Sequence, residues 1–402
     1  MDLDQIKKEF ESLSVNASLI VAVLALVHEP LTRTQLSAYM LATAKNQGSY
    51  KGNRLDAAQE ELQGLLSNGF VVKTQTGAFT CPNEVVNPAI HAALKHGFFE
   101  TICAHIQTST SFPKIVHGNV YARSYEQSIA GLRIALLRGQ PPTEILSWMD
   151  AAHRYKRANH QRPIVEVCGQ PFDPVLFSRL HVDVQGIVAG ELFGDAIWFQ
   201  RNGPALRQWL SEHPIPVVPF NEDFAFFAAE FCLWRGELDQ AAAMVKGFET
   251  PQVGAIHSAI MLLRSEHAAA ILEFERALKE LRKREGSRAY FAGLCGFLYV
   301  LALLKENQAA KTKRAKTYIE VATRETLGED IPFQYIQLMI FAREGMLNTN
   351  AERLKVPATA IPAKMFQSLV YYWLDIPRLK DAQVSLTESY KIAHNSGFEF
   401  LL

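Results

Sequence analysis

The stretch of sequence best suited to binding chemistry lies at residues 153–162, where cationic side chains gather around a tyrosine. These ten residues contain four basic side chains, two histidines and one tyrosine. Neutralisation of phosphates dominates the affinity of proteins for nucleic acid, so a local basic cluster is a candidate contact. The candidate nucleic-acid or partner-binding residues in this stretch are Arg154, Tyr155, Lys156, Arg157 and Arg162.

Two further basic clusters occur later in the chain. The first contains Lys279, Arg282, Lys283, Arg284 and Arg288, and the second contains Lys311, Lys313, Arg314 and Lys316. A charge run usually marks a solvated turn between helices, and this explains each cluster taken alone. Three clusters in a neutral chain would instead form one basic face if the fold brings them together. Arg282, Lys283 and Arg284 therefore join the candidate binding residues.

No sequence motif for catalysis or phosphate binding is present. The chain lacks GxxxxGK, GxGxxG, HExxH and GxSxG. A phosphate cradle, for example, needs successive free backbone amides and a glycine-permitted turn. His91 and His96 are five residues apart, which does not match the spacing of three or four on one helical face. We therefore predict no catalytic residue, no metal site and no cofactor, and we expect this segment not to be an enzyme.

The composition excludes several classes of protein. Forty-one basic and 41 acidic residues cancel, so no overall field attracts nucleic acid or anionic lipid. The five cysteines stand singly, without a CxxC pair, which favours reduced thiols. The apolar run 17–27 has eleven residues, whereas a membrane-spanning helix needs roughly 20. Acidic residues before that run argue against a signal peptide, so we expect a cytoplasmic protein with no membrane partner.

Residues 1–96 predict a winged-helix domain. Apolar patterns indicate helices over 15–28, 34–44 and 53–67, and a capping box precedes the second of them, from Thr32 to Gln35. Two short apolar runs on either side of a glycine turn then predict a β-hairpin. Three helices followed by a hairpin are the order of a winged helix, whose third helix enters the major groove when it binds DNA.

The third of these helices has mixed features for binding duplex DNA. Gln59 and Gln63 face outward and could read adenine edges, and Lys73 lies in the hairpin. Asp56 and Glu60 on the same face would repel phosphates. The predicted domain holds eight basic and nine acidic side chains, a net charge of −1. DNA contact and protein docking therefore both stay open for this domain.

The rest of the sequence predicts a helical connecting region over 97–220 and a repeat region over 221–402. In the repeat region Ala270, Phe274 and Ala277 place a small, a large and a small residue on one helical face. The spacing recurs at irregular intervals, as Ala315, Ile319 and Ala322, and as Ala382, Leu386 and Ser389. It resembles the second helix of a tetratricopeptide repeat. The expected fold is mostly α: an N-terminal winged helix followed by an irregular tetratricopeptide-like α-solenoid.

The segment from Phe274 to Leu304, with ALKELRKREGSRAYFAGLCGFLYVLALL at its centre, resembles the N-terminal extension of large bacterial Swi/Snf-type helicase-like ATPases. The TRTQL segment and its flanking helices are compatible with that extension. The resemblance covers most of the chain but none of the ATPase motor, which would lie downstream, so it assigns ATP hydrolysis to no residue here. The apolar end from Gly397 to Leu402 also suggests that the chain is truncated.

Two functions follow as expectations. The resemblance implies a non-catalytic recognition or regulatory region of a larger DNA-dependent helicase-like ATPase, in contact with DNA, a protein partner or the downstream ATPase domain. The alternative is the helical-repeat sensor region of a LuxR-type transcriptional activator, with a small ligand or protein on its concave face. The first predicts salt-sensitive DNA binding, whereas the second predicts a thermal shift with a metabolite or protein and no dependence on DNA.

Overall fold

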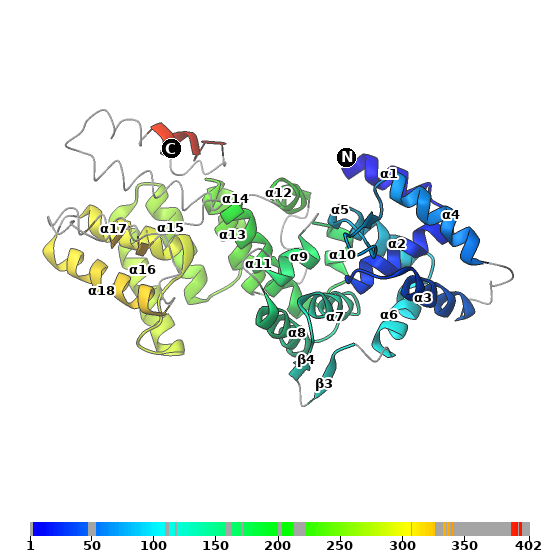
Figure 1. Ribbon diagram of the computed structural model, residues 1–402. Coiled ribbons are helices and arrows are strands. Elements are labelled where there is room, and N and C mark those ends of the chain that lie inside the picture. The colour runs from blue at the N-terminus through cyan, green and yellow to red at the C-terminus, as the bar shows by residue number, and fades with distance from the viewer. Residues whose placement is uncertain are drawn as a thin grey trace. The chain divides into compact units, whose positions relative to one another are not determined.

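The computed structural model is mostly helical, as the sequence predicts (Figure 1). It divides into two compact units, residues 1–188 and 189–402, each taken by itself below. The structure describes residues 3–46, 54–108, 112–116, 119–156, 162–169, 172–199, 203–212, 222–306, 308–325, 333–334, 336–337, 340, 387–392 and 394–395. Among these residues, no helix combines the length and the apolar character that crossing a membrane requires.

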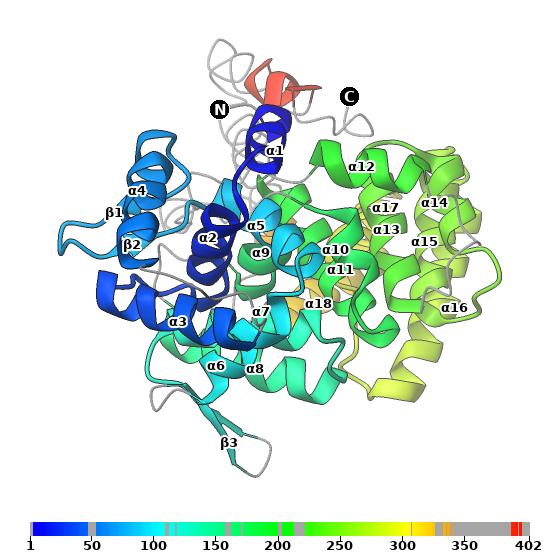
Figure 2. The ribbon, with the colours of Figure 1, turned by 90° about the vertical axis from the view of Figure 1, so that its right-hand side faces the viewer.

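The first unit begins with four helices and a hairpin. They are α1 (Leu3–Glu11), α2 (Val15–Val27), α3 (Arg33–Asn46), α4 (Arg54–Ser67), β1 (Val72–Lys73) and β2 (Phe79–Thr80). The two strands pair antiparallel, and the turn between them projects beside α4 (Figure 2). The helices predicted over 15–28, 34–44 and 53–67 and the hairpin are therefore present, with ends within two residues for the helices.

Two local interactions fix how the chain enters α3. The backbone N–H of Thr32 donates to Gln35 Oε1 at 2.9 Å, which is half of the predicted capping box. The other half is long, with Gln35 N at 3.4 Å from Thr32 Oγ1. Just before this cap, Leu31 and Phe79 exchange two backbone hydrogen bonds of 2.9 and 2.8 Å. This bridge adds a third short extended segment to the β1–β2 hairpin.

The rest of the first unit is a set of helices interrupted by a second hairpin. Its elements are α5 (Asn83–Lys95), α6 (Phe99–Thr108), β3 (Lys114–Val116), β4 (Asn119–Tyr121), α7 (Tyr125–Leu137), α8 (Pro142–Tyr155), α9 (Pro163–Cys168) and α10 (Pro174–Ser178). Helix α11 (Val182–Phe199) continues from this unit into the second. Strands β3 and β4 pair antiparallel and project from the helices, as both ribbon views show.

The core of the first unit surrounds α2. Residues 17–27 of this helix are all buried, because α2 contacts α3, α4, α5, α6 and α7 around its circumference. This position explains why the run of apolar residues in the sequence is continuous rather than periodic. Helices α7 and α8 approach closely, since a Cβ placed on Gly131 would lie 2.0 Å from the ring of Trp148. Only glycine fits at that crossing.

The described part of the second unit consists of helices. They are the remainder of α11, then α12 (Gly203–Glu212), α13 (Glu222–Trp234), α14 (Leu238–Met244), α15 (Pro251–Leu263), α16 (His267–Glu285), α17 (Gly293–Lys305) and α18 (Ala309–Glu325). The helix pair expected within 270–304 is present as α16 and α17. Of the expected third recurrence, Ser389 is buried, whereas Ala382 and Leu386 lie outside the described residues.

The small-large-small face of α16 lies against its neighbours. Ala270 and Phe274 are fully buried, and Ala277 is nearly so. A Cβ on Gly254 of α15 would be 2.9 Å from the Cβ of Ala277, so small residues on both helices allow close contact. On the other side, the rings of Phe274 and Tyr299 of α17 have centroids 5.3 Å apart. The aromatic residue is thus held between two helices, as its flanking alanines led us to expect.

Candidate recognition surfaces and a ligand pocket

The outer face of α4 is polar but not cationic. Gln59, Glu60 and Gln63 are exposed, and the Arg33 guanidinium donates a hydrogen bond to Gln59 Oε1. Lys73 is exposed in β1, whereas the side chain of Asp56 lies outside the described ones. Because Gln59 is already bonded and Glu60 would repel phosphate, this face offers little for a duplex backbone.

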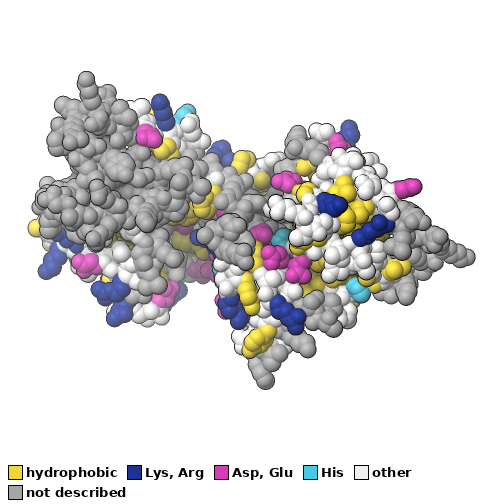
Figure 3. All heavy atoms as spheres, viewed as in Figure 1, with side chains coloured by type: hydrophobic (Ala, Val, Ile, Leu, Met, Phe, Trp, Pro, Cys, Tyr) yellow, Lys and Arg dark blue, Asp and Glu magenta, His cyan; other side chains and the backbone are white. Residues whose placement is uncertain are grey.

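The end of α8 and strand β4 together present cations and aromatic rings. Arg154 Nη2 donates to the carbonyl of Val120 at 2.7 Å, and the Tyr155 hydroxyl donates to the carbonyl of Ala122 at 2.7 Å. Both side chains stay exposed while their polar ends are fixed on the strand backbone. Over α8 and the hairpin, Figure 3 shows Lys and Arg side chains beside hydrophobic ones.

Two more exposed residues complete this surface. Val120 and Ala122 face the core, so their neighbours Tyr121 and Arg123 face outward, and Tyr121 is 58% exposed. We call Tyr121, Arg123, Arg154, Tyr155 and Lys156 the α8 patch. Within the described part of the chain, Arg123, Arg154 and Lys156 form no ion pair.

Of the two other residues predicted in this stretch, the structure describes one. Arg162 is exposed at the N-cap of α9, and Arg157 lies outside the described residues. Tyr121 and Arg123 were not among the residues predicted from sequence. The alternation of Val120 and Ala122 with polar or aromatic neighbours is the period-two signal that could have identified them.

Several basic residues of the second unit are instead paired with acids or backbone. At the end of α16, Arg282 Nε donates to the carbonyl of Ala289 at 3.1 Å, Lys283 Nζ lies 2.6 Å from Glu280, and Arg284 is exposed. On α18, Lys311 Nζ lies 2.5 Å from Glu306 and Arg314 pairs with Glu275 of α16. These pairs lower the positive potential that the sequence clusters would otherwise create.

A buried polar chain runs through the core of the first unit. Arg133 of α7 donates from Nη1 to the carbonyl of Ala25 at 2.5 Å and lies 3.4 Å from His28 Nδ1. His28 Nε2 lies 3.1 Å from one Glu166 oxygen, and the Tyr125 hydroxyl donates to the other at 2.6 Å. The arrangement holds a cation and a carboxylate on opposite sides of one imidazole.

The protonation of this chain follows from its burial. Burial, then the Arg133 charge, lowers the pKa of His28, so the imidazole is neutral near pH 7. Burial alone would raise the pKa of Glu166, but hydrogen bonds from His28 and Tyr125 outweigh it and lower that pKa. Neutral His28 therefore accepts at Nδ1 from Arg133 and donates at Nε2 to the Glu166 carboxylate.

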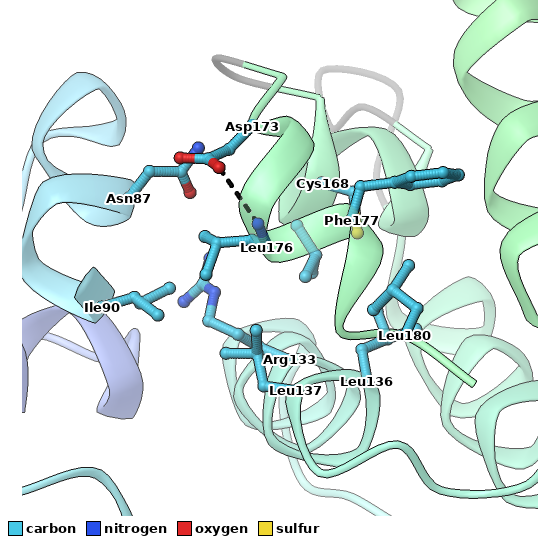
Figure 4. Close-up of a pocket in the computed structure, with 11 residues that line it drawn as sticks. Asn87, Ile90, Arg133, Leu136, Leu137, Cys168, Asp173, Leu176, Phe177 and Leu180 are labelled. Carbon is cyan, nitrogen blue, oxygen red and sulfur yellow. Dashed lines mark hydrogen bonds between the residues drawn. The ribbon is translucent and has the colours of Figure 1, made fainter. Parts of the chain in front are cut away.

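A small cavity adjoins Arg133. It has a volume of about 20 Å³, enough for one water molecule. Figure 4 shows Arg133 reaching from α7 toward Leu176, with Asn87 and Asp173 at the far end of the cavity. Arg133 Nε has no hydrogen-bond partner among the described residues. A water in this cavity would supply the missing acceptor.

A larger pocket opens between α1, α5 and the start of α10. Its volume is about 460 Å³, and its lining includes Phe10 of α1, His91 of α5 and Phe172 before α10. We call it the α5 pocket. Asn87 and Asp173 line both the α5 pocket and the small cavity beside Arg133.

A histidine–carboxylate pair forms part of the pocket wall. His91 Nε2 lies 2.7 Å from Asp173 Oδ2, while Oδ1 accepts the backbone N–H groups of Val175 and Leu176. Burial would raise the pKa of Asp173, but these hydrogen bonds, first that of His91, lower it. Asp173 is thus an acceptor only, so His91 carries a proton on Nε2 and leaves Nδ1 for another partner.

The described residues offer no chemistry for catalysis by thiols or metals. No group of three His, Cys, Asp or Glu side chains among them could hold a metal ion. Burial raises the pKa of Cys81, Cys103, Cys168 and Cys232 to about 12, so these thiols are protonated and unreactive near pH 7.

Comparisons with known proteins identify no relative: no family model, no curated protein and no solved structure matches the chain. Function is therefore inferred from the contacts, charges and cavities described above.

Proposed function

We propose that this chain is a non-catalytic recognition region of a larger DNA-dependent helicase-like ATPase and that the α8 patch contacts nucleic acid. The observation that carries the proposal is that three cations, which form no ion pair within the described residues, lie with two exposed tyrosine rings on one surface. Cations neutralise the phosphates of a strand, and exposed rings provide faces on which bases stack.

The geometry of the α8 patch favours a single strand over a duplex. Tyr121 is 58% exposed and Tyr155 is 41% exposed, and both belong to segments held by backbone hydrogen bonds. Stacking on such rings needs unpaired bases, because the faces of paired bases are covered by their neighbours. Polar anchoring of Arg154 and Tyr155 to β4 also keeps these side chains in place before binding, which reduces the entropy lost on contact.

The N-terminal part of the first unit supports the proposed winged helix. Three helices, a hairpin and the Leu31–Phe79 bridge have the order and strand pairing of that fold. The α4 face, with Gln59 bonded to Arg33 and with exposed Glu60, is poorly suited to phosphates. We therefore assign this domain to protein docking, including docking of the downstream motor.

The second unit supports the role of a tetratricopeptide-like scaffold. Its helices meet through small residues such as Gly254 and Ala277, and several of its surface cations are paired with acids. Stacked helical pairs of this kind present extended surfaces for proteins rather than catalytic sites.

Salt-dependent binding of an oligonucleotide tests the proposal. The full chain is titrated against a fluorescein-labelled single strand of mixed sequence, and anisotropy is followed at several salt concentrations. The double variant Arg123→Ala with Lys156→Ala should weaken binding and lower the slope of log K against log salt by about 1.4, since each single-strand phosphate contributes about 0.7.

A matched control removes the same charge from the other unit. Lys283→Ala with Arg314→Ala should leave both the affinity and the salt slope nearly unchanged, because Lys283 is paired with Glu280 and Arg314 with Glu275. Equal losses from the two double variants would show that net charge, not the α8 patch, governs binding. Absence of binding at low salt would reject nucleic-acid contact altogether.

A small-ligand sensor is the second candidate function, and the α5 pocket is the observation that favours it. Such a sensor would resemble the alternative of a LuxR-type activator, although this pocket lies in the first unit and not on the helical repeats. It predicts stabilisation by a small molecule that is independent of nucleic acid.

A further inference from the structure

The size of the α5 pocket fits a small molecule. Its volume of about 460 Å³ lies within the range of about 300–1,000 Å³ that is typical of ligand sites. Four segments of the first unit, namely α1, α2, α5 and the chain around the start of α10, form its walls. The pocket therefore depends on tertiary structure and is distinct from the α8 patch.

Rings dominate the apolar part of the pocket. Phe10, Pro88, Phe172 and Pro174 all line it. Each phenylalanine ring packs against a second ring. The ring centroids of Phe10 and Phe70 are 5.7 Å apart, and those of Phe172 and Phe177 are also 5.7 Å apart. Rigid ring walls favour a planar ligand, since aromatic surfaces gain most from offset or edge contacts with another ring.

The buried end of the pocket offers hydrogen bonds, and its one carboxylate, Asp173, already accepts hydrogen bonds from His91 and two backbone N–H groups. Ser18 and Asn87 are 4% and 5% exposed, and each side chain both donates and accepts. His91 adds an acceptor at Nδ1, because its Nε2–H is bound to the Asp173 carboxylate. An edge that carries both donors and acceptors would match these groups.

The rim of the pocket does not select charge. Two lysines and two glutamates stand exposed around the opening, namely Lys7, Lys95, Glu11 and Glu84. Their charges cancel, so the rim neither attracts nor repels an ion strongly. An uncharged ligand enters such a site without losing the hydration of an ion.

We propose that the α5 pocket binds an uncharged planar nitrogen heterocycle, of the size and hydrogen-bonding character of a nucleobase or nucleoside. The ring lies among Phe10, Phe172 and the two prolines, and its polar edge bonds to Ser18, Asn87 and His91 Nδ1. This site is independent of the oligonucleotide contact at the α8 patch, so either one can fail without the other.

Calorimetric titration of the full chain with adenosine, guanosine, cytidine and uridine tests this site. At least one nucleoside should bind saturably with one site per chain. Benzoate, a planar ring with a negative charge and no donor edge, should bind more weakly than that nucleoside. Stronger binding of benzoate, or no saturable binding of any nucleoside, rejects the proposal.

Variants locate the binding. His91→Phe keeps a ring but removes the acceptor, and it should weaken the nucleoside about tenfold, as expected for one hydrogen bond whose partner is left unsatisfied. Lys95→Ala, one turn further along α5, should change the affinity less than about twofold because the ligand is uncharged.

Ser18→Ala is a second variant of the pocket, and it tests the proposal even if His91→Phe disturbs folding. It removes one hydroxyl from the buried end of the pocket and should also weaken binding, while the thermal unfolding curve stays cooperative. Unchanged nucleoside affinity in both His91→Phe and Ser18→Ala would place the ligand elsewhere and overturn the assignment. Oligonucleotide binding should be the same in both variants as in the wild type.

Discussion

The basic cluster at the end of α8 and the basic clusters of α16 and α18 look alike in the sequence but differ in the structure. In the first, Arg154 bonds to a backbone carbonyl and Lys156 meets no acid within the described residues. In the second, Lys283 pairs with Glu280 and Arg314 pairs with Glu275. We therefore expect a run of cations to attract an anionic partner most strongly where the fold leaves the charges uncompensated.

The largest expected difference between the two regions is in how much stability is lost when the close helix contact in each one is disrupted. Gly131→Ala would place a Cβ 2.0 Å from the buried Trp148 ring, whereas Gly254→Ala would place one 2.9 Å from the Cβ of Ala277. Gly131→Ala should therefore cost about 3 kcal/mol of unfolding free energy and Gly254→Ala about 1 kcal/mol. Denaturant unfolding measures both values. Equal costs would mean that α7 and α8 can separate as readily as α15 and α16.

Removing an exposed ring should affect nucleic-acid binding in one region only. Tyr121→Ala should weaken binding of a single-stranded oligonucleotide by about 1–3 kcal/mol, the usual contribution of stacking one base on an aromatic side chain. Leu272→Ala is the matched control, because Leu272 is 70% exposed and lies on α16, the helix in which Lys283 is paired with Glu280. Anisotropy titration compares the two variants. A similar loss from Leu272→Ala would remove the distinction between the regions.

The pairing of His91 with Asp173 contrasts with the exposed pairs through its dependence on pH. The folded-state pKa of Asp173 lies below its ordinary value of 3.8, so its contribution is complete above pH 3.8 and is lost as pH falls through the folded-state pKa. Asp173→Asn should therefore cost about 1 kcal/mol at pH 6, and the cost should shrink below pH 3.8.

Unfolding curves at several pH values, recorded for wild type and Asp173→Asn, check this dependence. A cost that stays constant down to pH 3 would show that the ionised carboxylate does not provide the stabilisation. The exposed pair Arg264–Asp239 is the matched comparison, and its Asp239→Asn variant should differ from wild type by less than about 0.5 kcal/mol.

The smallest expected effect comes from removing the acids that pair with the cations of α16 and α18. Glu275→Gln with Glu280→Gln leaves Arg314 and Lys283 without their acids. Stability should change little because both pairs are largely exposed. Oligonucleotide affinity at low salt should rise about twofold to fivefold and return to the wild-type value at high salt. No rise at low salt would mean that charge compensation is not what separates the two regions.

Local patterns in the sequence predict much of the fold. The capping box at Thr32 and the apolar periods place the ends of α2, α3 and α4 within two residues, because these signals act over one or two helical turns. The small-large-small spacing around Phe274 likewise predicts a close helix contact, which the structure shows with α15.

The site depends on pairings that no local pattern contains. His91 and Asp173 are 82 residues apart, and Arg314 and Glu275 are 39 apart. Which acid meets which base is decided by the tertiary arrangement of helices. The sequence therefore shows where basic residues cluster but gives no indication of which cluster has its charges paired with acids. It also gives no indication of the α5 pocket, whose walls come from four segments of the chain.

The position of Arg133 has a consequence for how the protein unfolds. This side chain belongs to α7, yet it ends at the last turn of α2, where its hydrogen bond to Ala25 and its contact with His28 lie inside the core of the N-terminal helices. A fragment cut after residue 96 would lose this guanidinium and the apolar side chains of α7 that accompany it. Residues 1–188 should accordingly melt in one cooperative step. The amides of α2 should exchange slowly with solvent in residues 1–188, which include α7, but not in the fragment 1–96, which lacks it.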